Sequence, residues 1–242
     1  MMSQRLAVVD DHVLFAEAMV VALVNVGYDA RCVIPTLETP VGAPLVARVL
    51  EGAPDVVLLD LDLGGAGDGL DLIEHLAARS VVVVVTGSSD PVAVGKALAA
   101  GATTVLSKSM PFEKIVATLV RLRDGLPAMN RQERDRLLMR WREKVELDRE
   151  VKARFDLLTT REAQVLGQLM AGRQVSEIAR RSFVSESTVR TQVKSVLGKL
   201  QVNSQLTAVG LAYRARWRAP GAHASGEWNG TVSDLPPPRA SA

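Results

Sequence analysis

The run VVVVV at residues 81–85 is the clearest indication of a fold in this sequence. Successive side chains of a strand point to opposite faces of its sheet, and here every one of them is apolar. Both faces of such a strand must therefore be buried, which is typical of a parallel sheet covered by helices on either side. The run predicts an interior strand of an α/β fold.

Four other short apolar runs flank this one, and segments with helical spacing separate them. Strands are predicted at residues 6–9, 28–34, 56–59, 81–85 and 103–106. Strands that alternate with helices predict an α/β doubly wound domain with a five-stranded parallel sheet. Such sheets bind ligands beyond the carboxyl ends of their strands, where the strand order reverses. The residues that follow the strands are therefore the candidates for a functional site.

Acidic, hydroxyl and basic side chains occupy these positions. The residues that directly follow the predicted strands, or come within two residues of them, are Asp10, Asp11, Asp60, Thr86 and Lys108. Three carboxylates at one edge of a sheet would repel one another unless a hard cation lay among them, and Mg²⁺ prefers oxygen ligands. Asp60 could then attack a phosphoryl group, with Lys108 pairing with the phosphoryl oxygens and Thr86 donating a hydrogen bond.

Four segments resemble the receiver domains of two-component response regulators, and the resemblance runs from Leu6 to about Arg123. They are VVDDHVLFAEAM (8–19), DVVLLDLDL (55–63), VVTG (84–87) and GATTVLSKS (101–109). The resemblance implies that Asp60 is the phosphoacceptor, that a sensor histidine kinase is the donor, and that Thr86 and Lys108 sense the phosphate. It also implies a Mg²⁺ site formed by Asp10, Asp11, Asp60 and the backbone carbonyl of Asp62.

Two features depart from the usual receiver pattern. Leu63-Gly64 replaces the usual Met-Pro and opens a glycine-rich loop, residues 64–69, which is one residue longer and is expected to be more mobile. Val105 stands where receivers usually carry an aromatic switch residue. A regulator that binds DNA without phosphorylation therefore stays open as an alternative.

The C-terminal part has helix-turn-helix spacing. Thr159 and Glu162 form a capping box at the start of one helix, and a second helix is predicted at residues 175–181. After a turn at 182–184, Ser185 is the predicted N-cap of a third helix that runs to residue 200. The expected buried face of this helix comprises Val189, Val193, Val196, Leu197 and Leu200, and the outward face Ser187, Arg190, Thr191 and Lys194.

The same region resembles the LuxR-type output domain of NarL/FixJ response regulators over about residues 157–216. The resemblance lies in LTTREAQVL, GRQVSEIARRSFVSESTVRTQVKSVLGKL and QVNS. It implies that Arg190, Thr191 and Lys194 face the bases of double-stranded DNA, and that the last helix, residues 204–217, supports a homodimer. Lys199 and Arg181, nearer the helix ends, are predicted to meet phosphates. The usual His and Arg of the family are Gln192 and Gln205 here.

Between these regions lies a charge-dense stretch without Gly or Pro, residues 130–154, which predicts one long helix. Its apolar residues are Leu137, Trp141, Val145, Val151 and, just beyond, Phe155. They either pack on another helix or subunit, or belong to a solvated linker. The predicted domains are a receiver at 1–125, a helical linker at 126–155, a helix-turn-helix domain at 156–218 and a disordered tail at 219–242.

The net charge of +2 conceals an asymmetry. Residues 1–125 hold 9 Lys and Arg against 15 Asp and Glu, a net charge of −6, whereas residues 155–218 hold 10 against 4, a net charge of +6. An acidic half suits a cation and a basic half suits phosphate backbones. Neither a signal peptide nor a membrane span is recognisable, so a cytoplasmic location is expected. The single Cys32 is expected to fill the core.

These observations predict a DNA-binding transcriptional regulator, not an enzyme, that is activated by phosphoryl transfer to Asp60. Asp60-Leu61-Asp62 after an apolar strand also resembles the nucleophile motif of haloacid-dehalogenase-type phosphohydrolases. That motif normally closes the first strand, and a phosphohydrolase would not explain the basic domain. The hydrolase is therefore the less favoured alternative.

Overall fold

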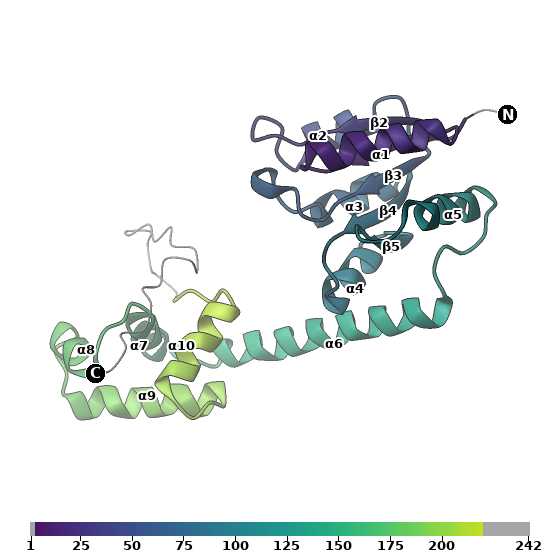
Figure 1. Cartoon of the computed structure of the whole chain (residues 1–242). Helices are drawn as coiled ribbons and strands as arrows, with labels where there is room; N and C mark the ends of the chain where they lie inside the picture. Colours follow the sequence, from purple (N-terminus) through teal and green to yellow (C-terminus); the bar gives the residue numbers. More distant parts are fainter. Residues whose placement is uncertain (1–2, 220–242) are drawn as a thin grey trace, which may run out of the picture. The chain divides into compact units, whose positions relative to one another are not determined.

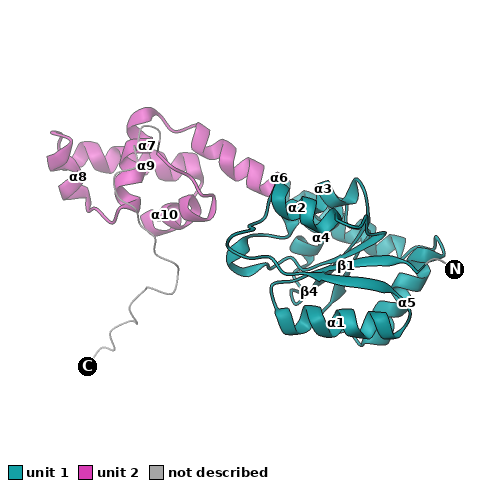
Figure 2. Ribbon diagram, turned by 90° about the horizontal axis from the view of Figure 1, so that it is seen from above, with its two compact units in different colours: residues 1–145 teal, residues 146–242 magenta. Residues whose placement is uncertain are grey.

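The computed structural model describes residues 3–219. The chain divides into two compact units, residues 1–145 and 146–242 (Figure 2). The boundary between them falls inside the predicted long helix. The predicted tail lies outside the described residues except for Ala219. Among residues 3–219, no helix combines the length and the apolar composition that crossing a membrane requires.

The first unit contains a five-stranded parallel sheet (Figure 1). Its strands are β1 Arg5–Val9, β2 Asp29–Val33, β3 Val56–Leu59, β4 Val81–Thr86 and β5 Thr104–Ser107. All five predicted strands are confirmed, and their order β2-β1-β3-β4-β5 puts the reversal between β1 and β3. The expectation for Cys32 was wrong: its side chain is exposed on β2, because this edge strand buries only Val33.

Helices cover both faces of the sheet. They are α1 Val13–Asn25 and α5 Phe112–Arg123 on one face, and α2 Ala43–Leu50, α3 Leu70–Ala77 and α4 Pro91–Ala99 on the other. Along β4, Val83 and Val85 pack with residues of α1 and α5, whereas Val82 and Val84 pack with residues of α2, α3 and α4. This alternation explains why four of the five valines must be apolar, whereas Val81, at the start of the strand, is exposed.

A further helix, α6 Arg131–Asp156, packs its N-terminal half on the first unit. Leu137 is only 9% exposed, and a Cβ at Gly95 of α4 would overlap its carbonyl oxygen and come within 2.8 Å of Trp141 Cβ. The Arg134 guanidinium donates to the carbonyl oxygens of Ala102 and Thr103, at 3.3 and 3.1 Å. This half of the predicted linker is therefore part of the first unit, whereas residues 142–150 are exposed.

The second unit is helical. Its helices are the C-terminal end of α6, α7 Thr160–Met170, α8 Val175–Arg181, α9 Glu186–Leu200 and α10 Gln205–Arg214. Phe155 at the end of α6 is buried and stacks on Trp217, with ring centroids 5.3 Å apart. The predicted capping box at Thr159 and the predicted N-cap at Ser185 are both present. The apolar residues near the two ends of α6 thus do pack, in two different cores, whereas Val145 in its middle is exposed.

The close approach of α4 and α6 makes alanine at Gly95 destabilising. In an open helix, Gly→Ala stabilises by about 0.5–1 kcal/mol, because alanine loses less backbone entropy on folding. At Gly95 the added Cβ would push on the backbone of α6, and we expect a loss of about 1–3 kcal/mol. Thermal unfolding, with hydrogen exchange of the amides of residues 134–141, measures the loss and locates it.

The matched control is Gly198→Ala in α9. Apart from the nearby backbone of α9 itself, no described atom lies within 4 Å of a Cβ at this position, so the same substitution should stabilise. Equal stabilisation by both substitutions would show that α4 and α6 are not packed against each other in solution.

Candidate functional site

Two buried carboxylates lie side by side at the carboxyl ends of β1 and β3. Asp10 is 2% exposed and Asp60 is 3% exposed. The two strands pair in parallel, and the Asp60 N–H donates to the carbonyl oxygen of Val9 at 2.9 Å. The residues that follow paired strands are therefore forced together, here at the point where the strand order reverses.

Lys108 supplies a positive charge to both carboxylates. Its Nζ lies 2.6 Å from Asp10 Oδ2 and 2.7 Å from Asp60 Oδ2. Its backbone N–H donates to the carbonyl oxygen of Thr86 at 2.9 Å, and its Nζ lies 4.8 Å from the ring centroid of Phe15. The end of β4 and the face of an aromatic ring therefore hold the ammonium group in place.

Burial and charge act against each other on the ionisation of this group of residues. Burial raises the pKa of the Asp60 carboxyl, and the hydrogen bond and charge of Lys108 only partly oppose this, so that pKa lies above its ordinary value. Burial lowers the pKa of Lys108, but hydrogen bonds to Asp10 and Asp60 outweigh it and raise the pKa above its ordinary value. One ammonium thus serves two carboxylates, which leaves an excess of negative charge that favours a further cation.

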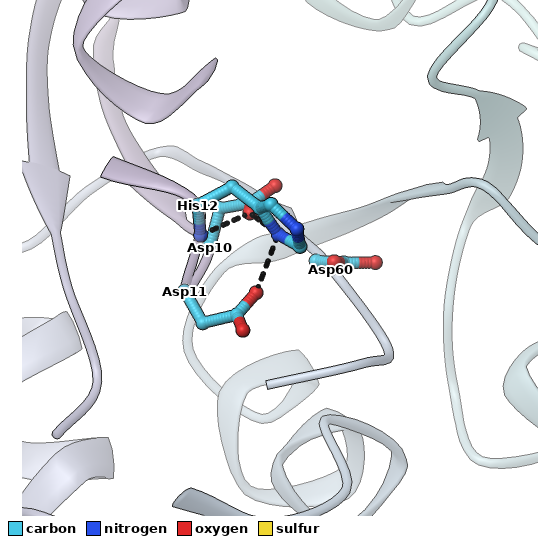
Figure 3. Close-up of side chains that lie close together, drawn as sticks. All are labelled: Asp10, Asp11, His12 and Asp60. Carbon is cyan, nitrogen blue, oxygen red and sulfur yellow. Dashed lines mark hydrogen bonds and ion pairs between the residues drawn. The ribbon is translucent and has the colours of Figure 1, made fainter. Parts of the chain in front are cut away.

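The ligand atoms for such a cation come from the predicted residues and from one that was not predicted. Atoms of Asp10, Asp11, His12 and Asp60 all lie within 4.8 Å of one another (Figure 3). His12 Nδ1 lies 2.8 Å from Asp11 Oδ1. Three carboxylates are oxygen ligands of the kind that Mg²⁺ prefers, so the donor set fits this ion. Only the position of His12, next to the two aspartates, could have indicated it from sequence.

Thr86 and Asp62 line the same surface pocket, of about 360 Å³, as Asp60 and Lys108. Thr86 is buried, and its Oγ1 accepts a hydrogen bond from the Ser88 N–H at 3.1 Å, which leaves its own proton available for donation. The Asp62 carboxylate is exposed and accepts from the Gly64 N–H at 3.1 Å, so its side chain does not join the acidic cluster.

The glycine-rich loop closes back onto the strand that carries Asp60. Residues Gly64–Ala66 form a 3₁₀ turn, η1, and Asp62 pairs with Asp68 in an antiparallel bridge. The Gly69 N–H donates to the carbonyl oxygen of Leu61 at 2.8 Å. A Cβ at Gly69 would overlap the carbonyl oxygen of Asp60, so only glycine allows this approach. The loop therefore has a defined structure beside Asp60.

The outward face of α9 carries the predicted DNA-contacting residues. Arg190 is 70% exposed, and Thr191 and Lys194 are exposed. Four of the five residues predicted to be buried, Val189, Val193, Val196 and Leu200, are buried on the opposite face, and the fifth, Leu197, is partly buried. The Thr191 hydroxyl donates to the carbonyl oxygen of Ser187 at 3.0 Å. Arg181, on α8, is exposed and lies 4.0 Å from Glu177. The structure thus brings the predicted basic residues to the surface of the second unit.

Lys199 differs from the other basic residues, because it is tied to the inside of the domain. Its Nζ lies 2.6 Å from Glu162 Oε2, and the Ser195 hydroxyl donates to Glu162 Oε1 at 2.6 Å. Glu162 also accepts from the Thr159 N–H at 2.7 Å. The sequence indicated only the capping role of Glu162, whereas the structure gives it a second role in joining α9 to α7.

Comparisons with known proteins agree with this division of the chain. Residues 6–120 match the response regulator receiver domain, and residues 156–212 match the bacterial regulatory proteins of the luxR family. A nitrate/nitrite response regulator protein homolog of Haemophilus influenzae is 30% identical over 71% of this chain and 80% of its own length. A probable transcriptional regulatory protein NarL of Mycobacterium tuberculosis is 29% identical over 88% of this chain and 94% of its own. The solved RcsB response regulator of Salmonella typhimurium is similar with a TM-score of 0.46 and 21% identity, covering 88% of this chain and all of that chain.

The three hydrogen bonds to Glu162 make the stability of the second unit pH-dependent. Although burial raises the pKa of Glu162, its bonds to Lys199, Ser195 and Thr159 outweigh this and lower it from 4.5 to about 2. A lowered pKa in the folded state stabilises the fold above pH 4.5, and the stabilisation is lost as the pH falls toward 2. We expect Glu162→Gln to lose about 2 kcal/mol at neutral pH and progressively less below pH 4.5.

Hydrogen exchange of the α9 amides at several pH values measures this difference. Glu177→Gln is the control, because Glu177 is exposed and its ion pairs should contribute well under about 1 kcal/mol. A pH-independent loss in Glu162→Gln would mean that packing, and not charge, accounts for the effect.

Proposed function

This chain belongs to the response regulators that join a receiver domain to a LuxR-type DNA-binding domain, and we propose that phosphoryl transfer to Asp60 controls its binding to double-stranded DNA. The chain is a transcriptional regulator of the two-component class, as its relatives are. In this proposal residues 1–125 receive the phosphoryl group, residues 156–218 bind DNA, and α6 connects them. The donor is a sensor histidine kinase, and the protein acts in the cytoplasm as a homodimer.

The observation that carries the proposal is the environment of the Asp60 carboxylate. Its Oδ1 accepts from the Leu61 N–H at 2.7 Å and its Oδ2 accepts from Lys108. These two bonds fix the plane of the carboxylate while the side chain borders an open pocket. A carboxylate held in this way can present an oxygen to the phosphorus atom of a donor. The new P–O bond forms as the bond between phosphorus and the donor atom breaks.

The other residues of the pocket would neutralise or hydrogen-bond the negatively charged phosphoryl group. Asp10, Asp11 and Asp60 would hold Mg²⁺, with the Asp62 carbonyl as a further ligand, and the bound ion would supply charge neutralisation to the phosphoryl oxygens. Lys108 already contacts Asp60 and would follow the negative charge onto the phosphoryl group. Thr86 would turn its free hydroxyl proton toward a phosphoryl oxygen. The aspartyl phosphate carries about two negative charges in place of the single charge of the Asp60 carboxylate, so the pocket gains about one negative charge.

Neither alternative is favoured by a specific observation. Asp60 follows β3 and not the first strand, which does not fit the haloacid-dehalogenase arrangement, and the family matches account for both halves of the chain. Because the family consists of transcriptional regulators, we propose that the chain does not act as an enzyme. The phosphorylation-independent regulator rests on the loop at residues 64–69 and on Val105, which is partly buried and packs against the core.

Loss of the Asp60 carboxylate should abolish phosphorylation. With acetyl phosphate and Mg²⁺, intact mass should show one phosphoryl group on the wild type and none on Asp60→Asn. Asp62→Asn is the control and should keep the label, because its carboxylate lies outside the acidic cluster. Stable labelling of Asp60→Asn would exclude Asp60 as the acceptor. Equal DNA affinity of labelled and unlabelled protein would instead favour the phosphorylation-independent regulator.

Arg190 and Arg181 should differ in what they contribute to DNA binding. An arginine that pairs with a guanine edge discriminates by about 1–3 kcal/mol, so Arg190→Ala should relax sequence preference. Arg181→Ala should weaken binding about equally on all duplexes and reduce the salt slope by about one unit. Binding to selected and scrambled duplexes at two salt concentrations separates these effects. Indistinguishable losses in the two variants would exclude α9 as the recognition helix.

A further inference from the structure

A carboxylate lies beside the arginine to which we assign base recognition. Glu186 is the first residue of α9, and its Oε2 lies 3.1 Å from the Arg190 guanidinium. Both side chains are accessible, at 49% and 70% exposure. The neighbour of Arg190 on the other side is Lys194, again four residues away and exposed. Glu186, Arg190 and Lys194 therefore form a row along one edge of the helix, in the charge order negative, positive, positive.

This row biases the position of the arginine side chain. Glu186 attracts the guanidinium toward the N-terminus of α9, and Lys194 repels it from the C-terminal side. Arginine has many rotamers of similar energy, so even a weak ion pair can select among them. The N-terminal residues of a recognition helix are those that contact base edges in the major groove. The attraction therefore acts in the direction in which base contacts are made.

Glu186 would also affect binding that does not depend on sequence. A carboxylate on a surface that approaches phosphates reduces the attraction to any duplex. The Glu186 carboxylate on this edge of a basic domain therefore lowers the affinity for DNA of any sequence. A gain in sequence discrimination would offset this loss. The same argument does not apply to Glu162, which is buried and bound to Lys199.

We propose that Glu186 is a specificity-determining residue that positions the Arg190 guanidinium for one guanine. It acts through Arg190 and not by direct contact with a base, so it is a positioning residue. The inference rests on the proposed DNA-reading function of α9. It adds a residue that neither the spacing of the basic side chains nor the outward face of the helix indicated.

The chain offers a closely matched control for this role. Glu177 lies in the first turn of α8 as Glu186 lies in the first turn of α9, and both are exposed. Glu177 lies 3.6 Å from Arg173 and 4.0 Å from Arg181, but it does not contact a base-facing residue of α9. Glutamine at either position removes one negative charge from the same domain and weakens the same kind of helix-dipole interaction. Only Glu186→Gln releases Arg190.

The experiment compares full-length Glu186→Gln, Glu177→Gln and Arg190→Ala. Each variant is first used to select DNA from a random pool. Its affinity is then measured for four duplexes, which differ only in the base at the pair where Arg190→Ala changes the preference. Both glutamine variants should bind scrambled DNA somewhat more tightly at low salt. Only Glu186→Gln should lose discrimination at that base pair, by about twofold, because Arg190 itself remains and the contribution of an exposed i, i+4 ion pair limits the effect.

Two results would overturn the inference while leaving the proposed function intact. One is that Glu186→Gln keeps the same discrimination as Glu177→Gln at the base pair that Arg190→Ala affects. The other is a loss in Glu186→Gln at a different base pair from Arg190→Ala, since Glu186 would then read DNA by itself. An unchanged preference in Arg190→Ala is a separate outcome, because it refutes the assignment of Arg190 and with it both proposals.

Discussion

Asp10 and Asp60 are buried next to each other, and a single ammonium group, that of Lys108, contacts both. The arrangement follows from the pairing of β1 with β3, which brings the residues after both strands to one place. Moving either carboxylate away would require a different strand order. The excess negative charge follows from this constraint, and the proposed binding of a cation and the proposed role of Lys108 in phosphoryl transfer depend on it. The tight approach of Gly69 to the Asp60 backbone keeps the same edge compact.

The long helix α6 contributes one end to the core of each unit, and its sequence does not show where one contribution stops and the other begins. Its first turns belong to the core of the first unit through Leu137 and Arg134, and its last turn belongs to the core of the second through Phe155. Residues 142–150, in the middle of the helix, are exposed and belong to neither core. Continuity of backbone hydrogen bonding, and not a hydrophobic interface along its length, is what joins the two ends. The N-terminal half of α6 packs on α4 through the close approach of Gly95 to Leu137 and Trp141.

The fold and most of the pocket could be predicted because they depend on local patterns. Apolar runs located the strands, and the rule that parallel strands present their carboxyl ends at one edge located Asp60, Thr86 and Lys108. The residues that were missed depend on packing between distant segments. Gly95 is an unfavourable residue in a helix until α6 packs across it, and the ion pair between Lys199 and Glu162 joins two helices that are separated in the sequence. Such pairs leave no periodic signal in a single sequence. The prediction that Lys199 meets a phosphate stays a prediction.

The two faces of α9 have different functions. Val189, Val193 and Val196 hold the helix in the domain, and Ser195 and Lys199 tie it to Glu162. The proposed base-facing positions take part in none of these contacts; their side chains are exposed, and the contacts that Arg190 and Thr191 make are to Glu186 and Ser187 of the same helix. A duplicated copy of the gene could therefore change Arg190, Thr191 or Lys194 and acquire a new operator without losing its fold. The residues that would set the DNA sequence preference are therefore separate from the residues that maintain the structure of the domain.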